Sequence, residues 1–184
     1  RALMERTAAE AMAIPTDGLP TEERITRDML QVIPELAIEE DDQHLHQLRV
    51  VDQMSGPQQL LPFLTQFEPA DTPARFEAFV ERLHAYPAYI GGHIETLAEG
   101  RASGLTAPRI VAERVIAQIE RMLEIPIESA LVPSMIKVAS DADREAVRDI
   151  VRDVVYPADV AFLEALKGDW RRAVDPAALE ERLK

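Results

Sequence analysis

The chain has 184 residues, of which 47% are hydrophobic and 5% aromatic, and its 33 acidic against 20 basic side chains give a formal charge of −13. This charge argues against nucleic acid or an anionic membrane surface as a partner, because both bind clustered Lys and Arg. The absence of Cys excludes disulfides, thiolate metal ligands and a Cys nucleophile. The length suits one domain, or one large fragment of a domain.

Neither a membrane anchor nor a signal peptide is predicted. No apolar run reaches the roughly 20 residues that cross a bilayer, and no basic segment followed by an apolar core opens the chain. We therefore expect a cytoplasmic protein. Both ends look cut, because the chain opens with Arg1 in place of Met and Asp175-Pro176 would begin a helix that runs to the last residue. One interpretation is that the sequence is part of a longer protein.

The first quarter of the chain is predicted to form two helices. Residues 1–14 have a helical composition that stops at Pro15 and Gly18. Thr21 is predicted to cap the second helix, with Glu22 and Glu23 in its first turn, where carboxylates complement the helix dipole. Apolar residues at helical spacing would form the inner face of this helix: Ile25, Met29, Val32, Ile33 and Leu36.

Two features complicate this second helix. Pro34 lies inside the pattern and removes a backbone hydrogen bond, so a kink or a break is expected there. The run Glu39-Glu40-Asp41-Asp42 is interpreted as a solvated helix end, or as the start of the next helix, in preference to a metal cage.

The middle of the chain predicts a short helix and then a long one. The short helix lies around residues 58–67, and prolines mark the loop that follows it. The long helix spans residues 72–99 and is expected to bend near Pro87 and Gly91-Gly92. Its buried stripe comprises Phe76, Phe79, Val80, Leu83, Tyr86, Ile90, Ile94 and Leu97.

Two further helices follow a turn that Gly100 and Gly104 bracket. Thr106 is predicted to cap the first, which ends before Pro126 and buries Val111, Val115, Ile119 and Met122. A capping box of Ser140 and Asp143 opens the second, which Gly168 would end. Its stripe is Val147, Ile150, Val151, Val154, Ala158, Ala161, Phe162 and Ala165, with Pro157 inside it.

Every long apolar pattern has a helical period and none repeats at a fixed interval. The sequence therefore predicts an all-α fold, an irregular multi-helix bundle with two long Pro-bent helices and no significant sheet.

Residue types suited to catalysis are sparse. His44-Leu45-His46 beside two aspartates is the one cluster of metal-ligand types, but residues two apart on a helix point about 200° from each other. No His precedes Glu in the His-Glu-x-x-His spacing of a zinc peptidase helix, and neither a Gly-x-Ser-x-Gly elbow nor a phosphate-binding loop occurs. We assign no catalytic residue and no metal ligand to this chain.

Several short motifs recur in an order that resembles a bacterial family, the domain-of-unknown-function 885 family. The resemblance covers roughly residues 21–166, and the run after Trp170 departs from the pattern expected of the family. The matching motifs are Gly56-Pro57, Arg82-Leu83 with Tyr86-Pro87, Glu99-Gly100 with Gly104, Pro108-Arg109, and Val155-Tyr156-Pro157-Ala158.

Full-length members of this family resemble α-helical zinc metallopeptidases, which implies that this region is the N-terminal half of such a protein. The zinc-binding helix would lie in the later half, so no cofactor is expected here and zinc is implied for the missing catalytic half. The chain would then wall a peptide-substrate groove as a non-catalytic helical half. The residues expected to contact the substrate are Arg82, His84, Tyr86, Tyr89 and His93.

The resemblance also implies partners. These are the missing C-terminal half or a second copy, which would cover an apolar patch framed by the helices at residues 72–99 and 140–167. The alternative is a free-standing helical protein-binding or scaffold module. A small hydrolase with an unrecognised site is a third interpretation.

Overall fold

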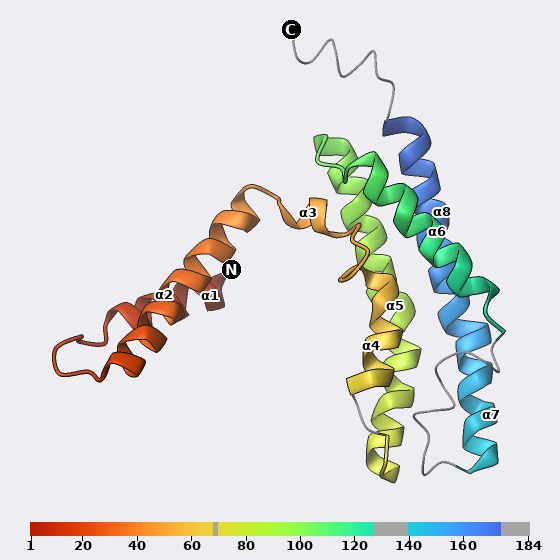
Figure 1. Ribbon diagram of the computed structural model, residues 1–184, viewed down its shortest axis with the longest axis horizontal. Helices are drawn as coiled ribbons and strands as arrows, with labels where there is room; N and C mark the ends of the chain where they lie inside the picture. Colours follow the sequence, from red (N-terminus) through yellow and green to blue (C-terminus); the bar gives the residue numbers. More distant parts are fainter. Residues whose placement is uncertain (68–69, 127–139, 174–184) are drawn as a thin grey trace, which may run out of the picture. The chain divides into compact units, whose positions relative to one another are not determined.

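The computed structural model describes residues 1–67, 70–126 and 140–173, whose regular secondary structure is entirely helical (Figure 1). The predicted all-α fold is confirmed for this part of the chain. The chain divides into two compact units, residues 1–46 and residues 47–184. The helix predicted to begin at Asp175-Pro176 and the loop position Pro69 lie outside the described residues.

The first unit is a hairpin of α1 (Ala2–Met12) and α2 (Thr21–Asp42). The end of α1 before Pro15 agrees with the sequence, and the acidic run ends α2 as one of the two expected alternatives. The predicted cap was wrong, because the N-cap of α2 is Pro20, with no side-chain hydrogen bond. Of the kink or break expected at Pro34, the break does not occur, since α2 runs on to Asp42.

The side of α2 that contacts α1 is opposite to the one expected. Arg27 donates from Nε to the Ala11 carbonyl oxygen at 3.1 Å and from Nη2 to that of Met12 at 3.2 Å. These carbonyls belong to the last turn of α1, and that of Ala11 also accepts from the N–H of Ile14 at 3.2 Å. Pro34 is buried on the same side of α2. The predicted inner face is not covered by α1, since its residues are 47% to 55% exposed: Ile25, Met29, Val32, Ile33 and Leu36.

The regular secondary structure of the second unit, in the part of the chain that the structure describes, is helical. Its core elements are α5, α6 and α8, and α8 continues α7 through one π-helical segment (Figure 1). The bounds are α3 (His46–Arg49), a 3-10 turn (Pro57–Gln59), α4 (Leu60–Phe67), α5 (Pro73–Ser103), α6 (Arg109–Glu124), α7 (Asp141–Ile150), the π segment (Val151–Val155) and α8 (Tyr156–Ala173).

Local capping interactions explain where several of these helices begin or end. Ser140 and Asp143 form the predicted capping box at the start of α7, and Gly104 ends α5 in the left-handed conformation at φ 77°. Thr106 was wrongly predicted as a cap, because α6 begins at Arg109 with Pro108 as its N-cap. Gly168 does not end the last helix, which extends to Ala173.

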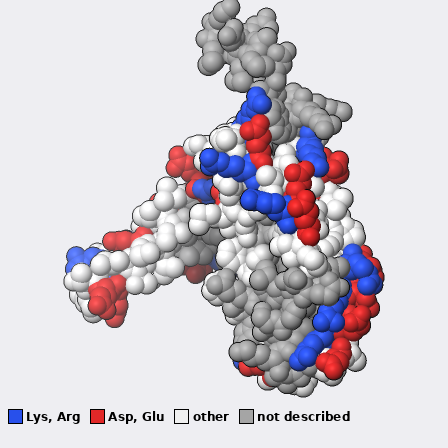
Figure 2. Space-filling model, turned by 45° about the vertical axis from the view of Figure 1, so that its right-hand side comes forward, with Lys and Arg blue, Asp and Glu red and all other residues white. Residues whose placement is uncertain are grey.

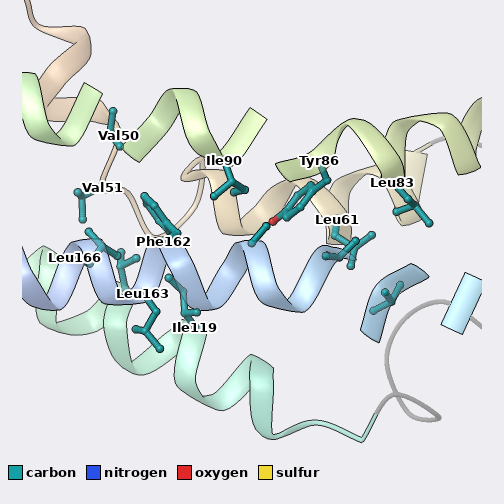
Figure 3. Packing of buried hydrophobic residues seen from close by; sticks show 14 of the residues in the cluster. Val50, Val51, Leu61, Leu83, Tyr86, Ile90, Ile119, Phe162, Leu163 and Leu166 are labelled. Carbon is teal, nitrogen blue, oxygen red and sulfur yellow. The ribbon is translucent and has the colours of Figure 1, made fainter. Parts of the chain in front are cut away.

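The core of the second unit lies between α5 and α8, with α6 on the other side of α8. Figure 3 shows Tyr86 and Ile90 of α5 pointing toward α8, and Ile119 pointing to α8 from α6. The side chains exposed by 1% or less include Phe79, Leu83, Tyr86, Ile90, Val115, Ile119, Val147, Val151, Val155 and Phe162.

The two long proline-containing helices therefore pack against each other through their apolar sides. Most of the exposed large hydrophobic side chains among the described residues lie in α1, α2 and the segment between them.

Candidate functional site

Four of the five residues expected to contact substrate share one face of α5. Arg82, Tyr86, Tyr89 and His93 follow one another at spacings of four, three and four, which places them in one row along a helix. His84 lies about 200° around the helix from Arg82 and faces elsewhere. Arg82 and His84 are both exposed. The structure therefore groups Tyr86, Tyr89 and His93 and separates His84 from them.

Tyr86 is part of the core rather than of the surface. Its hydroxyl donates to Asp159 Oδ1 at 2.7 Å, and both side chains are 1% exposed. Asp159 Oδ2 is buried and has no hydrogen-bond partner among the described residues. Burial raises the pKa of the Asp159 carboxyl from 3.8 to about 6, although the hydrogen bond from Tyr86 acts to lower it. Burial, and then the charge of Asp159, raise the pKa of Tyr86. This buried pair links α5 to α8.

The π segment explains why an aspartate reaches the core. Pro157 has no N–H and leaves the chain without one i→i−4 hydrogen bond. The N–H of Tyr156 donates instead to the carbonyl of Val151, five residues earlier. This wider turn rotates the helix by fewer degrees per residue than an α-helix does. As a result Val155 faces the core, and Asp159, about one turn later, is buried on the same side. The buried stripe predicted through Val154 and Ala161 is displaced accordingly, and Ala161 is exposed.

Tyr89 and His93 lie at the margin of the core. Their rings meet edge to face with centroids 4.5 Å apart, and the Tyr86 ring is 6.3 Å from that of Tyr89. Tyr89 is 41% exposed and His93 is partly buried. Burial lowers the pKa of the His93 imidazole, so this ring is neutral at pH 7. The pair offers an aromatic surface with two hydrogen-bonding tips beside it.

Two amide side chains, which sequence reasoning missed, form a second buried polar group. Gln58 is fully buried, and its Nε2 donates to the Asp52 carbonyl at 2.8 Å and to Gln118 Oε1 at 3.2 Å. Gln118 Nε2 donates in turn to the Gln53 carbonyl at 3.3 Å. A Cβ at Gly56 would collide with the Asp52 carbonyl oxygen and the Gln58 amide. The amide cluster ties the loop before α4 to α6.

Charged side chains are intermixed on the surface. Figure 2 shows acidic and basic side chains beside one another on the face in view. Three arginines near α7 each pair with an acid three positions earlier: Arg144 with Asp141, Arg148 with Glu145, and Arg152 with Asp149. No group of three or more His, Asp or Glu side chains in the described ranges is arranged to hold a metal ion. Nor is any helix of those ranges long and apolar enough to cross a membrane.

The family described as "Bacterial protein of unknown function (DUF885)" matches residues 1–181. The chain belongs to this family. The match is wider than the 21–166 expected and includes the run after Trp170 that was expected to depart from it. Searches of curated proteins and of solved structures gave no match.

Three of the motifs on which the resemblance was based have a structural explanation. Gly56 leaves room for the Gln58 amide, as above. Gly100 approaches the carbonyl of Leu105, where a Cβ would come within 2.6 Å, and its own carbonyl accepts from the Leu105 N–H at 2.8 Å. Tyr86 holds Asp159 of the opposing helix. These three motif residues therefore stabilise the packing of the second unit. Gly56 and Gly100 permit close backbone contacts, and Tyr86 makes a buried hydrogen bond to Asp159.

Proposed function

We propose that this chain is a non-catalytic helical half of a metallopeptidase-like protein and contributes a wall of its peptide-binding groove. The observation that carries the proposal is the aromatic pair of Tyr89 and His93, which is exposed on one side and held on the other by the buried Tyr86 and Asp159. A rigid aromatic surface binds apolar peptide side chains at little conformational cost. The resemblance to zinc metallopeptidases supplies the peptidase part of the proposal.

In this proposal each residue of the α5 row has a separate role. Tyr89 packs against an apolar side chain of the peptide, and neutral His93 exchanges a hydrogen bond with the peptide backbone. Tyr86 is a positioning residue, since it lies in the core and orients Tyr89 through the adjacent helical turn. Exposed Arg82 lies on the same face and attracts a peptide carboxylate. Zinc and the catalytic groups belong to the other half.

Peptide titration followed on the histidine ring signals tests this proposal. The chain has four His, so the imidazole C–H signals can be assigned by single substitutions. A hexapeptide with a central Phe should shift the His93 signal and leave that of His84, on another face of α5, in place. The same peptide with Ala for Phe should bind more weakly by about tenfold. Tyr89→Ala should abolish the shift, whereas His84→Ala should not.

Equal binding of the two peptides, or a response at His84 as large as at His93, would contradict the groove. The peptidase part has a separate test in the gene. A His-Glu helix of the zinc peptidase type encoded downstream of Lys184 supports it, and a stop codon directly after Lys184 contradicts it.

A second candidate, a free-standing helical protein-binding module, is favoured by a different observation. The apolar face of α2 is not covered by its own hairpin partner, α1. Exposed apolar surface of this kind marks interaction sites in proteins.

A further inference from the structure

An apolar face runs along the side of α2 that points away from α1. We name it the α2 face, and its residues are Ile25, Met29, Leu30, Val32, Ile33 and Leu36, each 45% to 55% exposed. They recur at three- and four-residue spacings over three helical turns, a length of about 16 Å. The contact with α1 uses Arg27 and Pro34, on the far side of the helix. The hairpin therefore presents two faces, one closed by α1 and one open.

The α2 face is hollowed. A cavity of about 390 Å³ is lined by Thr26, Met29, Leu30, Ile33 and Pro34. A second cavity, of about 220 Å³, does not belong to the α2 face. It lies where the loop between the two helices meets the Arg27 side of α2, and it is lined by Ile14, Leu19, Glu23, Thr26, Arg27 and Leu30. A hollow like the first accepts protruding side chains, as when an amphipathic helix inserts its anchors at i, i+3, i+4 and i+7. The shape of the face suits a helix.

The rim of the face is acidic. Asp28, Glu35 and Glu39 follow one flank of the apolar row, and Glu22 and Glu40 lie on the row at its two ends. α2 has two basic residues. Arg27 bonds to α1 and pairs with Asp28 at 2.8 Å, and Arg24 lies at the N-terminal end of the acidic flank, so the uncompensated acids of this flank are Glu35 and Glu39 toward its C-terminal end. A partner therefore gains from positive charge beside its apolar residues.

This charge pattern decides between occupants. A second copy of α2 would offer this flank no positive charge. Antiparallel packing would bring the two acidic flanks together, and parallel packing would set each acidic flank against the opposite flank, which carries Glu23 and no basic residue. The chain also carries a charge of −13. An anionic membrane would be repelled by the same rim. We propose that the α2 face docks an amphipathic helix of another protein whose apolar side is flanked by Lys and Arg.

This inference rests on the second candidate function and is independent of the peptide groove on α5. Its test uses two synthetic helical peptides with the same Leu and Met face, one with Lys and Arg on its flanks and one with Glu. Binding to the full chain is measured by fluorescence anisotropy. The basic peptide should bind at least tenfold more tightly than the acidic one, and added salt should weaken its binding.

Ile33→Glu tests the apolar contact, with Ile110→Glu on α6 as its matched control. The two isoleucines are 55% and 54% exposed, and both substitutions add one negative charge. If the basic peptide bound through charge alone, the two variants would bind it equally well. Docking on the α2 face predicts a loss of about tenfold or more for Ile33→Glu and little change for Ile110→Glu. The double variant Glu35→Lys with Glu39→Lys should favour the acidic peptide instead.

Equal effects of Ile33→Glu and Ile110→Glu, or equal affinity for both peptides, would overturn the proposal. A concentration-dependent dimer that Ile33→Glu dissolves, without peptide binding, would overturn it in favour of a second copy. Lowered thermal stability of Ile33→Glu without peptide binding would also overturn it, because the face would then be covered within the free chain. Tyr89→Ala should leave the anisotropy result unchanged, so failure of the groove and failure of the α2 face are separable.

Discussion

Replacing Asp159 with Asn should change how the stability of the protein depends on pH. The carboxyl of Asp159 has a pKa of about 6 in the folded protein, against 3.8 as its usual value, because it is buried. A raised carboxyl pKa means that the folded state binds the proton more tightly than the unfolded state. The stabilisation is complete below about pH 4 and is lost as the pH rises through 6. The amide that replaces the carboxyl is neutral throughout and keeps a carbonyl that accepts from Tyr86.

The size of the effect follows from the difference between the two pKa values. About two pH units at about 1.4 kcal/mol per unit correspond to about 3 kcal/mol in the free energy of unfolding. Between pH 4 and pH 7.5, the wild-type protein should therefore lose about 3 kcal/mol relative to Asp159→Asn. The comparison uses the change with pH, so any constant cost of inserting the amide cancels.

Urea unfolding followed by circular dichroism at 222 nm, repeated across this pH range, measures the difference. Asp153→Asn is a matched control about two turns away in the chain, because Asp153 is exposed and the Arg152 guanidinium lowers its pKa. Removing that carboxylate should alter the pH dependence in the opposite direction, and only slightly. Parallel pH profiles for the wild type and Asp159→Asn would refute the reasoning, since they would mean that Asp159 is hydrated or paired in solution.

Three further predictions concern local packing. Tyr86→Phe removes the hydrogen bond that lowers the pKa of Asp159, so the pH of the stability transition should rise, as the same urea series would detect; an unchanged transition would contradict the bond. Gly56→Ala should destabilise by about 1–3 kcal/mol in urea, while Gly91→Ala, whose Cβ meets no atom within 4 Å, should stabilise by about 0.5–1 kcal/mol; equal effects would contradict the close packing. Ser140→Ala should cost about 1 kcal/mol, measured as a lower melting temperature, and an unaltered one would exclude the capping box.

Sequence alone determined the helices because their signals are local. Ser140 and Asp143 are three residues apart, and the side chain of each accepts a hydrogen bond from the backbone N–H of the other. These bonds need no other element of the fold. Gly104 ends α5 for an equally local reason, the left-handed conformation that Gly adopts readily. The row of Tyr86, Tyr89 and His93 also follows from spacing once α5 exists. The capping box and the end of α5 were predicted because each depends on neighbours within about one helical turn.

Tertiary contacts decided which residues of each helix became buried. The apolar pattern of α2 predicted that the side of the helix with Ile33 would be buried. Arg27, on the opposite side, instead donates hydrogen bonds to the last carbonyls of α1, so that opposite side contacts α1. Spacing could not reveal this, because it shows that a helix is amphipathic and not which partner it meets.

The buried acid has the same kind of origin. Asp159 reads as a surface residue in sequence, and only the π turn before Pro157 and the Tyr86 hydroxyl on the opposing helix account for its position. A helical period assumed constant along the chain directs Val154 and Ala161 inward, whereas the widened turn directs Val155 and Asp159 there. Local sequence therefore determined the elements of this protein, and long-range hydrogen bonds and packing determined their facing sides, because those energies depend on residues 15 to 73 positions apart.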